Sequence, residues 1–218
     1  MSSLLSTLAT LLPTSPFPRP KRVTLLITGL DNAGKTTLIH RMRNPDPNDN
    51  ENNGLPSSGD IHLTTQTTTG GRKRLILNPI DTGLLQYRHH PGGIHQLWRD
   101  FLNDGNVSFV VFVVDAADAE RFDKAVMLFG SLLRILDEME RKGDVERTKI
   151  PVLVLGNKID HYGAVAEAEL RERLGLKPGC GRNEGAKEEN SRPMELFMCS
   201  AVTRQGYPEG FDWLTGYL

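Results

Sequence analysis

One run of residues has the composition of a phosphate-binding loop. Gly29–Thr36 (GLDNAGKT) fits the pattern G-x-x-x-x-G-K-[ST]. The glycines permit a tight turn whose backbone N–H groups face phosphate oxygens, and the N-terminus of a following helix adds partial positive charge. Lys35 can reach the β- and γ-phosphates of a nucleotide, and the Thr36 hydroxyl is a ligand for Mg²⁺. The segment therefore predicts a nucleoside phosphate with its Mg²⁺ ion.

A second segment, Asn157–Asp160 (NKID), has the residue types that distinguish guanine from adenine. The Asp160 carboxylate can accept hydrogen bonds from N1–H and the exocyclic amine of guanine. Adenine presents the wrong pattern, and a mismatch between buried polar groups is costly. The segment follows an apolar run well downstream of the phosphate loop, and this position favours guanine recognition over a solvated turn.

A third segment, Asp81–Gly83 (DTG), also follows an apolar run. An aspartate at the end of a strand can hold Mg²⁺, usually through water, and the Gly83 N–H can contact the γ-phosphate. An ordinary turn has the same letters. The two more specific motifs favour Asp81 as part of a metal site.

Hydrophobic patterning supplies elements that can position these motifs. Apolar runs predict strands at 23–28, 74–80, 107–114, 150–155 and 196–199, with a half-exposed strand around Ile61 and Leu63. Helices are predicted over 36–43, 167–174 and 208–218, with a long one from a cap at Asp118 to about Lys142. Strands that alternate with helices predict an α/β fold with a mainly parallel central sheet and helices on both faces.

The long helix has an apolar stripe that is expected to face the sheet. The stripe comprises Phe122, Val126, Phe129, Leu133 and Leu136.

Composition excludes several classes of protein. The 218 residues are 24% charged and 38% hydrophobic, which is typical of one globular domain. A formal net charge of −1 argues against a nucleic-acid partner held by bulk charge. The two cysteines, Cys180 and Cys199, fit a reducing compartment better than a disulfide framework. No apolar run approaches the roughly 20 residues of a membrane-spanning helix.

The first 22 residues differ in character from the rest. Leucines recur at helical spacing over residues 3–12, which predicts an amphipathic helix, and prolines at 13, 16, 18 and 20 then form a stiff link. The positive charge follows the apolar stretch, unlike that of a secretory signal. We therefore expect two parts, an N-terminal segment over 1–22 and a globular domain over 23–218. A disordered tail or a helix packed on the core is the alternative for residues 3–12.

Together these segments resemble the small GTPases of the Ras-like superfamily, and five stretches of the chain resemble the Arf/Sar group in particular. The phosphate loop (GLDNAGKTT) resembles that group, and Val114–Phe122 (VDAADAERF) and Leu155–Asp160 (LGNKID) resemble its Sar subfamily. The most specific likeness is Leu196–Gly210 (LFMCSAVTRQGYPEG). Trp98–Phe101 also resembles the Sar stretch after the second switch region.

The resemblance implies a single Ras-like P-loop GTPase domain that binds GTP or GDP with Mg²⁺ and acts as a switch in COPII coat assembly for transport from the endoplasmic reticulum to the Golgi. It implies an exchange factor, an activating protein and inner COPII coat proteins as partners. Residues 3–12 would enter the endoplasmic reticulum membrane in the GTP state, and the protein would cycle with the cytosol. Nucleotide contacts carried over by the resemblance are Asp31, Asn32, Ala33, Gly34, Lys35, Thr36, Thr37, Gly83, Asn157, Lys158, Asp160, Ser200, Ala201 and Val202.

The two switch regions depart from this family. The first switch normally offers Pro-Thr, whose threonine closes on Mg²⁺. Here Pro56-Ser57 is the best match, and Thr64 or Thr65 is the alternative to Ser57. The second switch normally reads Asp-x-Gly-Gly-His, with a histidine that orients the attacking water.

In this chain Leu84-Leu85 follows Gly83, and Gly-Gly and histidine occur only at Gly92–His95. His95 is therefore our predicted water-orienting residue, with His89 and His90 as further candidates. Slow intrinsic hydrolysis with retained nucleotide binding is expected. A degenerate GTPase that holds nucleotide and scaffolds partners is the competing function.

Overall fold

The computed structural model describes residues 21–43, 61–66, 72–82, 92–103, 105–142, 149–176 and 192–218. The strands are β1 (Lys21–Thr28), β2 (Ile61–Gln66), β3 (Arg72–Asp81), β4 (Val107–Asp115), β5 (Val152–Asn157) and β6 (Met194–Met198). The helices are α1 (Lys35–Arg43), α2 (Gly93–Asn103), α3 (Phe122–Lys142), α4 (Glu167–Arg173) and α5 (Tyr207–Thr215), and a 3₁₀ turn, η2 (Ala119–Arg121), precedes α3.

The strands form one sheet in the order β2-β3-β1-β4-β5-β6. All neighbours are parallel except the edge pair β2 and β3. The register pairs Ile27 with Asp81 and Asp115 with Asn157. The carboxyl ends of β1, β3, β4 and β5 therefore lie along one edge, and the predicted mainly parallel sheet is confirmed.

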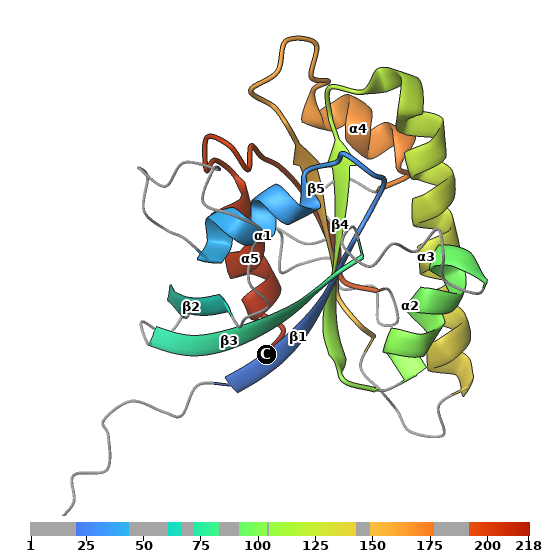
Figure 1. The fold of residues 1–218 in the computed structure, drawn as a ribbon, viewed down its shortest axis with the longest axis vertical. Coiled ribbons are helices and arrows are strands. Elements are labelled where there is room, and N and C mark those ends of the chain that lie inside the picture. The colour runs from blue at the N-terminus through green and yellow to red at the C-terminus, as the bar shows by residue number, and fades with distance from the viewer. Residues whose placement is uncertain are drawn as a thin grey trace, which may run out of the picture.

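Helices cover both faces of this sheet, as predicted (Figure 1). Helices α1 and α5 share one apolar cluster with one side of the sheet, and α2, α3 and α4 share a second cluster with the other side. In β1, Leu25 and Ile27 face the first cluster while Leu26 faces the second, and none of the three has exposed surface. A strand covered on both faces is apolar at successive positions, which explains the uninterrupted run in the sequence.

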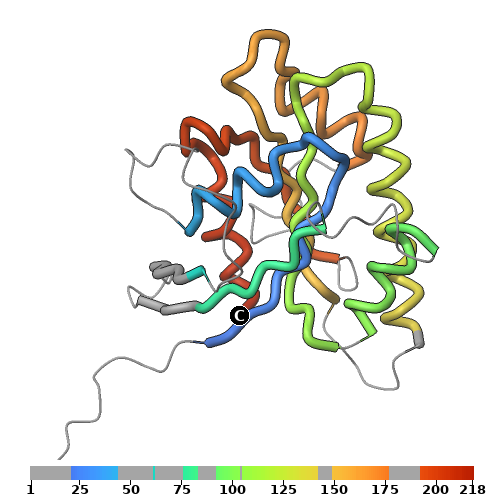
Figure 2. Tube along the Cα trace, viewed as in Figure 1, coloured from blue at the N-terminus to red at the C-terminus, as the bar shows by residue number. Residues whose placement is uncertain are grey.

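The end of the chain returns to its first strand. Figure 2 traces α5 to the C-terminus beside the start of β1, where the Lys21 Nζ atom lies 3.5 Å from the Leu218 carbonyl oxygen. Among the described residues no helix is long and apolar enough to cross a membrane.

Most predicted elements are present, with shifted ends. Strand β5 extends through Asn157, two residues beyond the predicted end, because its pairing with β4 continues to Asp115. Helix α2 was not predicted, although Ile94, Leu97 and Trp98 have helical spacing. Two glycines at its start, each with a left-handed φ, obscure that pattern.

Two details of the long helix differ from expectation. Asp118 occupies the cap position of η2 without a side-chain capping hydrogen bond, because its carboxylate instead accepts a hydrogen bond from Arg121. The predicted stripe is correct at Phe122, Phe129 and Leu136. Val126 and Leu133 lie at its margin, only partly buried. Its centre consists of Ala125, Leu132 and Ile135, since the helix is rotated slightly from the predicted orientation.

A buried ion pair holds α4 against β6. The Arg171 Nη2 atom lies 2.5 Å from a carboxylate oxygen of Glu195, whose side chain has no exposed surface, and 2.9 Å from one of Glu167. Burial by itself lowers the pKa of Arg171, but hydrogen bonds to the two carboxylates outweigh it and the net shift is upward. Arg171 thus keeps its positive charge at neutral pH.

Substitution of Arg171 tests the contribution of this pair. Arg171→Gln leaves Glu195 buried without its cation, and we expect a loss of about 3–5 kcal/mol in the free energy of unfolding. Arg99→Gln, which breaks an exposed pair with Glu138 between α2 and α3, is the control and should cost less than about 1 kcal/mol. Urea denaturation of both variants measures the difference, and equal losses would contradict this assignment.

Candidate functional site

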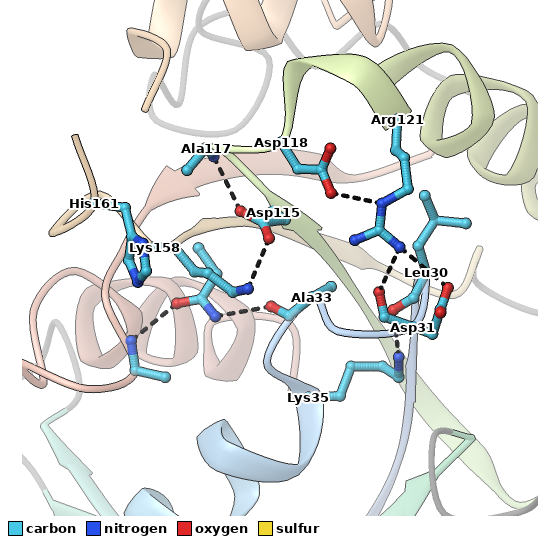
Figure 3. Close-up of polar contacts among 12 residues, drawn as sticks. Leu30, Asp31, Ala33, Lys35, Asp115, Ala117, Asp118, Arg121, Lys158 and His161 are labelled. Atoms are coloured by element: carbon cyan, nitrogen blue, oxygen red, sulfur yellow. Dashed lines mark hydrogen bonds and ion pairs between the residues drawn. The ribbon is translucent and has the colours of Figure 1, made fainter. Parts of the chain in front are cut away.

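The motifs selected from the sequence meet at one edge of the sheet. The phosphate loop leaves β1, Asp81 ends β3, Asp115 ends β4 and Asn157 ends β5. Parallel strands direct their carboxyl ends to the same side, which is where ligands bind in open α/β sheets. Figure 3 shows the phosphate loop, the end of β4 and Lys158 facing one another at this edge.

The loop between β1 and α1 has the backbone of an anion-binding cradle. Gly29, Asn32 and Gly34 have φ values of 133°, 60° and 93°. Left-handed residues between right-handed ones turn successive N–H groups towards a common point and form an anion-binding concavity. A Cβ atom on Gly29 would lie 2.1 Å from the Val113 carbonyl oxygen, and one on Gly34 would lie 2.2 Å from Asn157 Nδ2. Both glycines are therefore required by conformation and by space.

Lys35 lies inside this loop. Its side chain is almost fully buried, and Nζ donates hydrogen bonds to the carbonyl oxygens of Gly29 at 3.1 Å and Leu30 at 2.6 Å. Burial lowers the pKa of Lys35, while the Asp81 and Asp31 carboxylates act in the opposite direction. A cation at this position, shielded from water, interacts strongly with phosphate oxygens.

Thr36, in the first turn of α1, and Asp81, at the end of β3, are brought together. The Thr36 hydroxyl donates a 2.7 Å hydrogen bond to Asp81 Oδ2, and Asp81 is buried. No cluster of three or more histidine, cysteine or acidic ligands occurs among the described residues. A hydroxyl beside one carboxylate is the sparse, all-oxygen set that suits Mg²⁺, which keeps water and takes its remaining ligands from phosphates. The pair thus fits Mg²⁺.

Asn157 joins the phosphate loop to the segment after β6. Its Nδ2 atom donates to the Ala33 carbonyl oxygen at 2.8 Å, and its Oδ1 atom accepts the Ala201 N–H at 2.9 Å and the Cys199 thiol at 3.8 Å. Burial raises the pKa of Cys199 to about 12, so the thiol keeps its proton. The sequence indicated Asn157 as a site residue, but not this bridging contact.

Lys158 and Asp160 lie on either side of Ile159 in the loop after β5. Lys158 has a φ of 71°, and its Nζ atom lies 2.7 Å from Asp115 Oδ2. The other Asp115 oxygen accepts the Ala117 N–H at 3.0 Å. Asp160 Oδ2 lies 3.8 Å from His161 Nε2. The loop therefore presents an acidic side chain beside a lysine that is anchored to β4.

Ser200, Ala201 and Val202 lie next to Asn157. Ser200 and Ala201 are buried, whereas Val202 is 52% exposed. The Ser200 N–H donates to Gln205 at 3.0 Å and the Ala201 N–H donates to Asn157. Two of these three predicted nucleotide contacts thus donate their backbone N–H groups to acceptors within the protein, which the sequence did not indicate.

Asp31 is held differently from the other loop residues. Its carbonyl and carboxylate oxygens both accept hydrogen bonds from Arg121, at 3.2 and 3.3 Å. Asn32 is exposed, Ala33 is buried, and Thr37 is half-buried in the first turn of α1. The Asp31 carboxylate points to Arg121, so a nucleotide contact by this residue would come from its backbone N–H. Arg121 was not among the predicted site residues.

His95 lies in the first turns of α2, exposed, with its ring 5.5 Å from that of Trp98. Trp98 is fully buried and donates from its indole nitrogen to the Thr28 hydroxyl at 3.0 Å. Ser57, Gly83, Leu84, Leu85, His89 and His90 lie outside the described residues, as do the side chains of Thr64 and Thr65. The role of His95 stays a prediction.

The fold, the phosphate loop and the guanine-type motif define a P-loop GTPase domain. Residues 12–218 match the ADP-ribosylation factor family, so the chain belongs to the Arf family of small GTPases, which are GTP-binding switches. The Arf/Sar resemblance seen in the sequence is confirmed at this level.

Similar relatives come from more than one branch of the family. The small COPII coat GTPase SAR1 of Giardia intestinalis is 30% identical over 203 residues, which cover 91% of each chain. The protein of the same name from Nicotiana tabacum is 28% identical over 210 residues, 91% of this chain and 90% of its own. ADP-ribosylation factor-like protein 3 of Caenorhabditis elegans is 27% identical over 207 residues, 92% of this chain and 90% of its own.

The second loop glycine offers a test of the cradle. Gly34→Ala imposes a left-handed alanine and a contact with Asn157, whereas Gly175→Ala imposes a left-handed alanine in open space. We expect Gly175→Ala to cost about 1–2 kcal/mol and Gly34→Ala to cost at least about 1 kcal/mol more, with loss of affinity for GDP in Gly34→Ala only. Thermal unfolding and GDP titration measure both. Equal behaviour of the variants would contradict the required close approach.

Proposed function

We propose that this Arf-family chain holds GDP or GTP with Mg²⁺ at the carboxyl edge of its sheet and hydrolyses GTP. The Asn157 bridge is the observation that carries the proposal, because this buried amide of the guanine-type motif bonds to both the phosphate loop and the segment after β6. A satisfied buried hydrogen-bond network of this kind fixes the relative positions of the two segments.

Each predicted residue has a role in this proposal. Gly29–Thr37 and Gly83 surround the phosphates, and Thr36, Asp81 and Ser57 hold Mg²⁺. The residues beside the base are Asn157, Lys158, Asp160, Ser200, Ala201 and Val202. When bound, Mg²⁺ neutralises charge on the phosphate oxygens.

The chemical work of the described residues is mainly electrostatic. Lys35 supplies a buried cation, and the loop N–H groups supply fixed dipoles that need no reorganisation during the reaction. In this family the histidine that orients water lies in the second switch, and His95 is our candidate for it. An activating protein would complete the stabilisation of the transition state, as it does for GTPases with slow intrinsic turnover.

The cellular role we propose is that of the SAR1 relatives, whose names describe a COPII coat GTPase. The protein would then act at the cytoplasmic face of the endoplasmic reticulum in transport to the Golgi and cycle with the cytosol. Residues 3–12 would form the membrane contact, with an exchange factor, an activating protein and the inner COPII coat as partners. The sequence likeness of residues 114–122 and 196–210 to the Sar subfamily supports this choice.

A nucleotide-binding scaffold with little turnover is the second candidate. One observation favours it, namely that His95 is part of helix α2 and its ring lies 5.5 Å from that of Trp98 in a tilted orientation. A histidine fixed on a helix is less able to reach a γ-phosphate than one in a loop that closes on the ligand.

Single-turnover hydrolysis separates the two functions. The native chain, loaded with GTP, is expected to release phosphate at or below roughly 10⁻⁴ s⁻¹, because the second switch departs from the family pattern. In His95→Ala the residual rate should fall further. GTP release without hydrolysis is measured in parallel, so that slow turnover is distinguished from weak binding.

Two results would decide against these ideas. A rapid rate that His95→Ala leaves unchanged contradicts both the slow turnover and the role of His95. No detectable hydrolysis with tight GTP binding supports the scaffold instead.

Liposome sedimentation tests the membrane role. The GTP form of the full chain should sediment with liposomes that contain anionic lipid, and the GDP form should remain largely in the supernatant. A single short amphipathic helix binds reversibly, so removal of residues 1–12 should abolish the difference. Equal sedimentation of the two nucleotide forms, with and without residues 1–12, would refute this role.

A further inference from the structure

The segment from the end of β4 to the start of α3 contacts both nucleotide motifs, although the proposed function gives its side chains no role. Asp115, at the end of β4, pairs with Lys158 of the guanine-type motif. Arg121, at the end of η2, reaches Asp31 of the phosphate loop. Figure 3 shows the two contacts on either side of this segment. The stretch Val114–Phe122 therefore has a position from which it can hold the site together.

The Arg121 guanidinium is oriented by Asp118 and also contacts the phosphate loop. Its Nε atom donates a 2.5 Å hydrogen bond to Asp118 Oδ2, and its Nη1 atom donates to the Asp31 carbonyl and carboxylate oxygens. The Arg121 side chain is only 26% exposed. The hydrogen bond to Asp118 raises the pKa of Arg121, which keeps its charge at any physiological pH. A planar guanidinium can serve two acceptor groups in this way, whereas an ammonium cannot keep the same fork.

The outer turn of the phosphate loop is thus held by hydrogen bonds from two sides. Lys35 donates a hydrogen bond to the Leu30 carbonyl oxygen from inside the loop. Arg121 donates one to the next carbonyl oxygen, that of Asp31, from outside. The Asp31 carboxylate, by contrast, places negative charge near the position where phosphate oxygens would bind. The nearby guanidinium offsets that charge.

We infer that Arg121 is a positioning residue for the phosphate loop, which holds Asp31 so that the loop keeps its phosphate-binding conformation and releases nucleotide slowly. The inference rests on the proposed nucleotide site. Arg121 acts through Asp31 and contacts no reacting atom.

The release rate of N-methylanthraniloyl-GDP from the full chain, chased with unlabelled GDP, tests this role. Arg121→Gln should release the nucleotide roughly fivefold faster, since it removes both a loop contact and the compensating charge. Arg121→Lys retains the charge without the fork and should lie between Arg121→Gln and the native chain. Arg134→Gln, which loses an exposed hydrogen bond to Ser131 on the outer side of α3, is the control and should match the native rate.

A double-mutant cycle shows whether the effect runs through Asp31. In an Asp31→Asn background, Arg121→Gln should change the rate by clearly less than it does in the native background, because the partner carboxylate is already gone. A purely structural role for Arg121 predicts the same fold-change in both backgrounds. Circular dichroism establishes that each variant is folded, and Arg121→Lys carries the test if Arg121→Gln does not fold.

The outcomes separate this inference from the proposed function. If the native chain does not bind the labelled GDP, the nucleotide site itself is refuted and the role of Arg121 with it. If the native chain binds and Arg121→Gln releases at the native rate, or the cycle shows no coupling, the role of Arg121 is overturned while the nucleotide site stands.

Discussion

The buried amide of Asn157 connects segments that are distant in the chain. Its two polar ends bond to Ala33, 124 residues away, and to Ala201, 44 residues away. A buried amide that lost either partner would leave an unsatisfied polar group, which costs roughly 1–3 kcal/mol. Gly34 has to lack a side chain because this amide occupies the space beside it. The shape of the phosphate loop, the end of β5 and the position of the last loop all depend on this group.

The charged side chains of the site differ in how deeply they lie around the Asn157 amide. Lys35 is buried within the phosphate loop, and the buried Asp81 carboxylate accepts a hydrogen bond from Thr36. Farther out, Asp115 anchors Lys158 and Asp118 orients Arg121. An inner cation in a low-dielectric setting attracts phosphate strongly, while the more exposed pairs contribute mainly by fixing geometry. Binding strength and loop position are thus supplied by different residues.

Membership of the Arf family separates what is shared from what is particular to this chain. The match covers residues 12–218, and a SAR1 protein and an ADP-ribosylation factor-like protein 3 are nearly equally identical to this chain, at 30% and 27%. The nucleotide-binding framework is common to all of them. This chain departs from the family pattern in the two switch regions, at Pro56-Ser57 and Leu84-Leu85. Binding and turnover are therefore separate questions for this protein.

The sequence determined the local features. Apolar runs before Gly29, Asp81 and Asn157 predicted three of the strands. The glycine spacing predicted the phosphate loop, and the alternation of elements predicted the parallel sheet. These follow from short-range patterns of φ, burial and hydrogen-bonding capacity. Helix α2 has the same kind of pattern, and glycines at its start obscured it.

Only the tertiary structure decided which side chains meet across the chain. Arg121 and Asp31 are 90 residues apart, and Thr36 and Asp81 are 45 apart. The parallel register that pairs Ile27 with Asp81 brings the end of β3 beside the loop that follows β1. The end of β4, and the segment with Arg121 that follows it, are positioned by the packing of β4 against β1 and β5. No single segment of the sequence contains that packing.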